Sequence, residues 1–109
     1  MSTITAHTDH VTLINVFTVQ PERARQLADL LTAATEDVMQ YIDGFISANI
    51  HLSTDGTRVV NYAQWRSVEA MQAMRENPTA REHMAACAEL ADAFEPHLYT
   101  VESVHAANV

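Results

Sequence analysis

The sequence has few cysteines, glycines and basic residues, and each shortage excludes a class of protein. Cys87 is the single cysteine, so no intramolecular disulfide can form and a reducing compartment is expected. The two glycines, Gly44 and Gly56, are too few for a Gly-rich phosphate loop or a G-x-G-x-x-G fingerprint. No Cys/His cluster has the spacing of a metal site. We therefore expect no flavin, nicotinamide or metal cofactor.

Positive charge and long apolar runs are also scarce. Six arginines and no lysine stand against 14 acidic residues, which gives a net charge of −8. The arginines are scattered along the chain, so we expect no nucleic-acid partner and no anionic membrane surface as partner. No apolar run approaches the ~18 residues of a spanning helix. The N-terminal segment MSTITAHTDH lacks the features of a signal peptide. We therefore expect a cytoplasmic protein.

Hydrophobic residues, in contrast, make up 48% of the 109 residues. This length is near the commonest domain size, and this composition is sufficient for a compact core. We expect a single domain over residues 10–105, preceded by a flexible polar tail at residues 1–9.

Four segments have the β-branched and aromatic residues, or the alternation of apolar and polar residues, that are typical of strands. They are residues 10–19, 45–52, 57–65 and 97–104. Asp55-Gly56, between the second and third segments, is a strong β-hairpin signal.

Two helical regions are predicted between these strands. The first begins at Pro21, a residue suited to the first helical position, and is expected to end near Asp43-Gly44. The second runs from Ser67 to about Phe94 and is interrupted at Asn77-Pro78. Asn77 and Thr79 compete as the cap of its second half.

The resulting order, β-α-β-β-α-β, predicts an α+β protein with the ferredoxin-like arrangement. In that arrangement the helices cover one face of a single antiparallel sheet. The strands nevertheless carry apolar residues on both faces, so the uncovered face needs a second covering. A second copy of the chain is the simplest one, and we expect a homodimer packed sheet to sheet.

Polar side chains on the predicted strands point to a site. These residues are Asn15, Asn49, His51, Asn61 and Trp65. Asn is depleted in strands, and a buried amide without a partner costs roughly 1–3 kcal/mol. Several such groups in one sheet indicate a pocket for a small molecule. Taken singly, Asn61 fits a structural contact, Trp65 a core position and His51 the surface, so convergence remains a hypothesis.

The segment His51–Trp65, HLSTDGTRVVNYAQW, resembles the antibiotic biosynthesis monooxygenase family. It is most similar to small cofactor-free members that convert aromatic polyketide precursors of the anthrone or quinol type to quinones. The resemblance is close in His51–Ser67 and Gly44–Ala48, and it covers nearly the whole chain in element order. It implies a dimeric α/β barrel, an aromatic substrate and O2.

The resemblance implies a catalytic role for Asn15, Asn61, Trp65 and His51. In the expected reaction the deprotonated substrate passes an electron to O2, a hydroperoxide forms, and loss of water leaves the quinone. The two amides and the indole N–H are donors that stabilise an oxyanion or a peroxide oxygen. His51 is the expected proton acceptor, because an unperturbed histidine has a pKa of about 6.5.

The resemblance also indicates residues that contact the substrate. Met71 stands where quinone-forming relatives carry an aromatic hydroxyl, and Met84 stands near the position of a second-helix arginine. Arg81, one turn earlier, is a candidate replacement for that arginine. Together with Phe17, these form the expected substrate-binding set. Because these residues differ from those of the relatives, the resemblance specifies the reaction class more closely than the substrate.

Two alternatives remain open. The first is binding and degradation of haem by the same fold, with His83 as the axial ligand, although the helix tryptophan of such proteins would fall near Met74. The second is a barrel that binds a hydrophobic ligand without catalysis, because a fold alone does not establish an activity.

Overall fold

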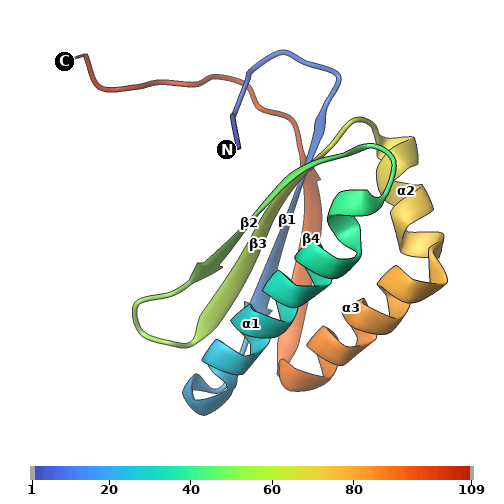
Figure 1. Ribbon diagram of the computed structural model, residues 1–109. Helices are drawn as coiled ribbons and strands as arrows, with labels where there is room; N and C mark the ends of the chain where they lie inside the picture. Colours follow the sequence, from blue (N-terminus) through green and yellow to red (C-terminus); the bar gives the residue numbers. More distant parts are fainter. Residues whose placement is uncertain (1, 109) are drawn as a thin grey trace.

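The computed structural model describes residues 2–108, in which a four-stranded antiparallel sheet carries three α-helices on one face (Figure 1). The strands are β1 (Val11–Thr18), β2 (Phe45–Leu52), β3 (Arg58–Trp65) and β4 (Ala93–Tyr99). The helices are α1 (Pro21–Asp37), α2 (Val68–Glu76) and α3 (Pro78–Leu90), with a short 3-10 turn η1 (Met39–Tyr41) after α1. The strand order is β2-β3-β1-β4, which confirms the ferredoxin-like α+β fold. None of the helices within the described range is long and apolar enough to cross a membrane.

Side-chain caps define where the second and third helices begin. The Ser67 hydroxyl accepts a hydrogen bond from the Ala70 N–H at 3.1 Å and starts α2. The Asn77 Oδ1 accepts from the Ala80 N–H at 3.1 Å, so Asn77 rather than Thr79 is the cap of α3. Each cap satisfies a backbone donor that the helix itself leaves unpaired.

The predicted hairpin between β2 and β3 is present and is held by its own side chains. The Asp55 carboxylate accepts hydrogen bonds from the Thr57 N–H at 3.0 Å and from the Thr57 hydroxyl at 2.7 Å. Gly56 has a φ of 75°, a left-handed conformation that glycine adopts without steric cost. This turn fixes the register of β2 against β3.

The first helix is shorter than predicted, because α1 ends at Asp37 instead of near Asp43. In its last turns Thr32 and Thr35 donate their hydroxyls to the carbonyl four residues earlier, at 2.9 Å in both cases. Such bonds compete with the regular helix ladder. The chain then passes through η1 and turns into β2 at Gly44, which has a φ of 90°.

The last strand lies earlier than predicted, at Ala93–Tyr99 instead of 97–104, and α3 correspondingly ends at Leu90. Pro96 was expected to precede the strand but lies inside it, paired with Asn15 of β1. Proline is tolerated here because β4 is an edge strand, where one backbone N–H need not join a ladder.

The sheet register decides which side chains face the helices. Asn15 of β1 pairs with Asn61 of β3, and the row continues to Pro96 on β4 and Ile50 on β2. Residues two positions apart share a face, so this row and its alternate neighbours form the side under the helices.

A β-bulge changes the pattern at the start of β2. The register shifts between Phe45 and Ser47, which brings Phe45 opposite Trp65. The two rings meet edge to face, with centroids 5.5 Å apart and an interplanar angle of 83°. The bulge therefore adds an aromatic side chain to the helix-covered face that simple alternation would place on the other face.

Candidate functional site

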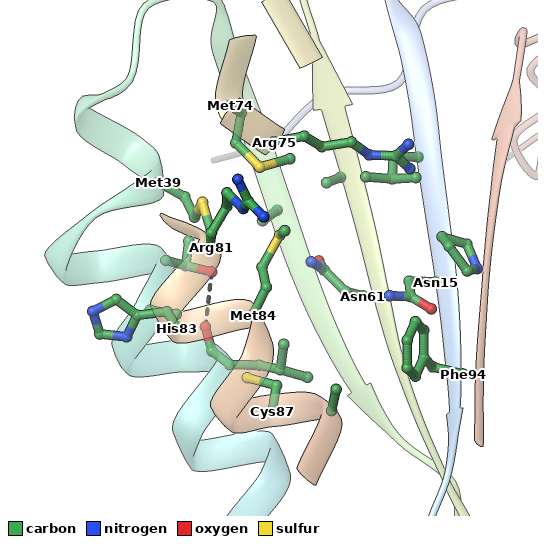
Figure 2. A pocket seen from close by; sticks show the side chains of 18 of the residues that line it. Asn15, Met39, Asn61, Met74, Arg75, Arg81, His83, Met84, Cys87 and Phe94 are labelled. Carbon is green, nitrogen blue, oxygen red and sulfur yellow. Dashed lines mark hydrogen bonds between the residues drawn. The ribbon is translucent and has the colours of Figure 1, made fainter. Parts of the chain in front are cut away.

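A cavity of about 510 Å³ lies between the helices and the sheet (Figure 2). Its sheet side is formed largely by β1 and β3, and its opposite side by α3 with parts of α1, η1 and α2. Most lining residues are apolar. Small-molecule sites in proteins occupy about 300–1,000 Å³ and combine such a lining with a few convergent polar groups.

Three of the predicted catalytic residues line this cavity together. Asn15 and Asn61 come from facing positions of β1 and β3, and Trp65 lies on the same face of β3. Figure 2 shows both asparagine amides directed toward the space under α3. The Oδ1 atoms of Asn15 and Asn61 and the Nε1 atom of Trp65 are buried and have no hydrogen-bond partner within residues 2–108. Buried polar atoms are rarely left unpaired in proteins, because each costs about 1–3 kcal/mol. Three such atoms around one cavity indicate a site prepared for a polar ligand.

Small and aromatic side chains give the cavity a shape suited to flat rings. Ala63 lies between Asn61 and Trp65 on the same face of β3, and Ala48 is its partner on β2, so the sheet surface is low at this point. Phe17 of β1 and Phe94 of β4, with ring centroids 6.1 Å apart, also line the cavity. Aromatic walls of this kind favour stacked or edge-on contacts with aromatic ligands.

The side facing the sheet is built from flexible side chains. Met39, Met74 and Met84 line it, and thioether side chains adapt their shape to a ligand at low cost. Arg75 and Arg81 also line the cavity, each with an exposed side chain. Three of the four predicted substrate-binding residues, Phe17, Arg81 and Met84, are therefore in the lining.

Three predicted site residues, Asn49, His51 and Met71, lie elsewhere. His51 pairs with Val60 on β3, is exposed on the helix-free face, and places its Nδ1 3.2 Å from the Asn49 carbonyl oxygen. It does not line the cavity, so the sheet separates it from the three polar residues. Met71 is 1% exposed in a core cluster with Trp65, and it too is absent from the lining. Its place in the core leaves no surface for a ligand.

Other cavity residues were missed by sequence reasoning. Phe45 was missed because the bulge changes the face that its side chain takes. Phe94 was missed because β4 was predicted to begin only after Pro96. Arg75 gave no signal, because nothing in the local pattern of α2 separates a cavity-facing arginine from a solvated one. His83 borders the cavity from α3, but its ring points away from the strands (Figure 2). That orientation offers no support for an axial ligand.

Cys87 also lines the cavity, and burial makes it unreactive. The thiol is buried on α3, and desolvation raises its pKa to about 11. The thiolate is the nucleophilic form of cysteine, so the group stays neutral and inert near pH 7. Within residues 2–108 no cluster of three or more His, Cys, Asp or Glu residues could hold a metal ion.

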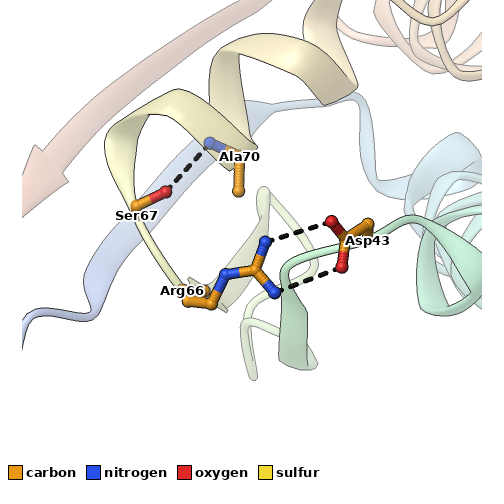
Figure 3. Close-up of polar contacts among 4 residues, drawn as sticks. All are labelled: Asp43, Arg66, Ser67 and Ala70. Atoms are coloured by element: carbon orange, nitrogen blue, oxygen red, sulfur yellow. Dashed lines mark hydrogen bonds and ion pairs between the residues drawn. The ribbon is translucent and has the colours of Figure 1, made fainter.

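An exposed ion pair fixes the turn beside Trp65 (Figure 3). Arg66 donates from both terminal nitrogens to the two carboxylate oxygens of Asp43, each at 3.1 Å, and this pairing lowers the pKa of Asp43. The Arg66 backbone N–H also donates to the Gly44 carbonyl at 2.7 Å. A Cβ at Gly44 would overlap the Cβ of Ala70 on α2. The entry to β2 and the start of α2 are thus packed directly against each other.

Known proteins resemble this chain in both sequence and structure. Residues 10–86 match the model of the family described as antibiotic biosynthesis monooxygenase. The tetracenomycin-F1 monooxygenase of Streptomyces glaucescens is 48% identical over 87 residues, which cover 80% of this chain and 78% of the relative.

Solved structures have the same architecture. One is a monooxygenase from the gene ActVA-Orf6 of Streptomyces coelicolor in complex with nanaomycin D, with a TM-score of 0.79, 28% identity, and coverage of 93% of this chain and 94% of that one. Another is SnoaB, a cofactor-independent oxygenase from Streptomyces nogalater, with a TM-score of 0.75, 24% identity, and coverage of 89% and 97%. The second likeness is evidence for the fold.

Proposed function

Because this chain belongs to the antibiotic biosynthesis monooxygenase family and is a cofactor-free monooxygenase, we propose that it oxidises an aromatic polyketide of the anthrone or quinol type to a quinone with O2. The observation that carries this proposal is the set of three unpaired polar atoms on the sheet side of a largely apolar cavity. The names of two relatives support the substrate class, since one acts on tetracenomycin F1 and the other was solved with nanaomycin D.

Binding comes first in the proposed mechanism. The flat ring system enters between the sheet and the methionine-rich helix side, with its edges against the aromatic pairs Phe45–Trp65 and Phe17–Phe94. A ring hydroxyl faces the two asparagines. Each amide provides an oxygen that accepts a hydrogen bond from the hydroxyl and an NH2 group that donates one.

Ionisation of the substrate follows, and the hydroxyl proton passes to solvent. The Trp65 indole N–H and the amide N–H groups donate to the oxygen on which negative charge develops, and this favours the ionised form. Their effect is larger than in water, because the cavity is shielded by apolar side chains and its effective dielectric constant is low. The donors are held by strands, so little reorganisation accompanies the reaction.

Oxidation completes the sequence. The substrate anion passes one electron to O2, giving a substrate radical and superoxide, and these combine to form a C–O bond as a peroxide. Protonation gives the hydroperoxide. The carbon that bears the hydroperoxide then loses its remaining proton while the O–O bond breaks. The hydroxide released takes up a proton and becomes water. One oxygen atom stays as the new carbonyl, and the other becomes water together with two substrate hydrogens.

Oxygen uptake by metal-free and flavin-free protein tests this proposal. We expect consumption above the autoxidation rate with members of a panel of anthrones and polycyclic quinols, with one O2 consumed per quinone formed. Binding of these compounds without oxygen uptake would instead support a non-catalytic hydrophobic-ligand protein. A Soret shift on addition of haem would support the haem alternative.

We also propose that the protein is a homodimer, formed through the helix-free face of the sheet. Ile14, Val16, Val60 and Tyr62 share that face and are only partly buried in one chain. Sedimentation equilibrium of the protein and of Val60→Glu checks this point. A wild-type protein that sediments as a monomer at all concentrations would contradict it.

A further inference from the structure

Two registers are available to the start of β2, and only one of them brings a second aromatic ring to Trp65. Ser47 pairs with Gln64, so an unbroken ladder would place Ile46 opposite Trp65. The bulge places Phe45 there instead, and Ile46 is left exposed. Because both residues are apolar, hydrophobic patterning alone does not select the bulged register.

Contacts outside the cavity select that register. The Arg66 guanidinium donates to both carboxylate oxygens of Asp43, each at 3.1 Å, and so joins the chain before β2 to the chain after β3 (Figure 3). The Arg66 backbone N–H donates to the Gly44 carbonyl at 2.7 Å. In an unbroken ladder Phe45 would take the place of Gly44 opposite Arg66. The backbone bond could then not form, and Asp43 would lie one residue farther from its partner.

Stability alone does not explain this ion pair. Its two side chains are 59% and 90% exposed, and ion pairs in contact with water contribute little to the free energy of unfolding. An arginine–carboxylate contact with two parallel hydrogen bonds nevertheless fixes the geometry of the segments that it joins. Arg66 directly follows Trp65, and Asp43 comes two residues before Phe45. The pair therefore acts on the alignment of the two aromatic residues.

The aromatic contact links this alignment to the cavity. Trp65 is 2% exposed, and its Nε1 atom has no hydrogen-bond partner among residues 2–108. Packing, and not a hydrogen bond within that range, therefore decides where the indole N–H points. Phe45 meets the indole edge to face, with centroids 5.5 Å apart and an interplanar angle of 83°. Such contacts depend on the relative orientation of the two rings.

We propose that Phe45 and the Asp43–Arg66 ion pair are positioning residues that orient the Trp65 indole N–H in the cavity. This inference rests on the proposed function and adds to it the means by which one donor is held in place. Asp43 and Arg66 lie outside the cavity lining and act through the strand register. A donor that is aligned before the reaction needs no reorganisation, so a tilted indole should cost rate more than binding.

The test observes the indole directly. Trp65 is the only tryptophan, so a 1H–15N NMR spectrum of the protein contains a single indole N–H signal. This signal is recorded without substrate, and kcat and KM are measured separately by oxygen uptake with an anthrone. The variants are Asp43→Asn, Arg66→Gln and Phe45→Leu.

Two further variants serve as controls for the indole signal. Arg58→Gln removes an exposed arginine at the other end of β3. Phe17→Leu removes an aromatic ring that lines the same cavity but packs in a different core cluster from Trp65. Neither control should move the indole signal.

We expect Phe45→Leu to shift the indole signal, because the ring current of Phe45 is lost. The two ion-pair variants should move the signal toward that position or split it, as the unbroken register becomes populated. Their kcat should fall by about 3- to 10-fold, up to the cost of losing the N–H itself, with KM changed by less than about twofold. In a Trp65→Phe background, Asp43→Asn should lower kcat no further, because residues that act through one group are not additive.

An indole signal that stays in place in both ion-pair variants would overturn the inference, even if their melting temperatures fell, because a purely structural pair would change stability alone. A further fall in kcat when Asp43→Asn is added to Trp65→Phe would also overturn it. A failure of the proposed function is distinguishable, because oxygen uptake would be missing in every protein while the indole signal still moved in the ion-pair variants.

Discussion

Asn15 and Asn61 are direct cross-strand partners on β1 and β3, and both place an amide in the same cavity, where its oxygen has no hydrogen-bond partner among residues 2–108. A pair of this kind contributes little to folding, because each buried oxygen has lost water and gained nothing in exchange. Its value lies in the contacts that it makes with a substrate. Loss of either amide should therefore reduce activity more than stability.

Replacing Asn61 or Asn15 by Ala should lower kcat for anthrone oxidation by about 10²-fold, which is the usual cost of removing one oxyanion donor. The melting temperature should stay the same or rise, since the variant removes an unpaired buried group. Asn49→Ala is the matched control, because Asn49 lies on the opposite face and bonds the Tyr62 carbonyl. A large loss of melting temperature in the cavity variants, or an equal loss of kcat in the control, would contradict this prediction.

Trp65→Phe removes the indole N–H but keeps an aromatic ring against Phe45. We expect kcat to fall by about 10-fold or more, with a smaller change in KM, because the N–H acts mainly on the charge that develops during reaction. Steady-state oxygen uptake measures both constants. An increase in KM alone would mean that the tryptophan serves binding and not the developing charge.

His51→Ala should leave kcat and KM within about twofold of the wild type, since mutations far from a site seldom alter it strongly. The imidazole is exposed on the helix-free face and is absent from the cavity lining. The pH dependence of kcat should also be the same in the two proteins. A large fall in kcat in the variant would restore His51 as the proton acceptor.

Stability should decrease in acid, partly because of Asp55. Hydrogen bonds from the Thr57 side chain and backbone, and from the Ser53 hydroxyl, lower its pKa from 3.8 to about 2. The folded state therefore binds the proton less readily than the unfolded state, so this stabilisation is complete above about pH 4 and is lost as pH falls toward 2. Thermal unfolding between pH 2 and 5 measures the slope. Asp55→Asn should make that slope shallower, and an unchanged slope would contradict the assignment.

Gly44→Ala should destabilise the protein by about 2–5 kcal/mol, because a left-handed backbone costs about 1–2 kcal/mol and an overpacked contact about 1–3 kcal/mol. Gly44 has a φ of 90°, and its new Cβ would overlap Ala70. Gly56→Ala provides the control, since Gly56 also has a positive φ but its nearest neighbour would be Pro21 at 3.6 Å. The control should lose only the backbone part, about 1–2 kcal/mol. Equal losses in denaturant unfolding would show that packing at Ala70 is irrelevant.

The sequence predicted the sheet because period-two alternation and a strong hairpin signal constrain β3 closely. The catalytic role of Asn15, Asn61 and Trp65 stays a prediction, which the sheet register supports by bringing them to one face. The sequence misplaced His51 because membership of a motif does not say which face a side chain takes. That choice follows from the pairing with Val60. Met71 was misassigned because a buried methionine and a cavity methionine look alike in a helical pattern.

The errors at β4 and β2 have a different cause, since both depend on irregular strand geometry. Pro96 normally signals a break, and only its position on an outer strand permits pairing with Asn15. Phe45 faces the helices because of a bulge that no local sequence pattern predicts. Arg75 was not predicted, because its place in the cavity lining depends on how α2 packs over the sheet, which is a three-dimensional property.

Pro96 also bears on how the molecule behaves at high concentration. It stands in the middle of the outermost strand, with residues of that strand paired to β1 on both sides of it. A proline there removes one donor and places a bulky ring along the free border, so another chain cannot continue the ladder smoothly. The border that exposes Phe94, Leu98 and Tyr99 is thereby protected against fibril-like growth.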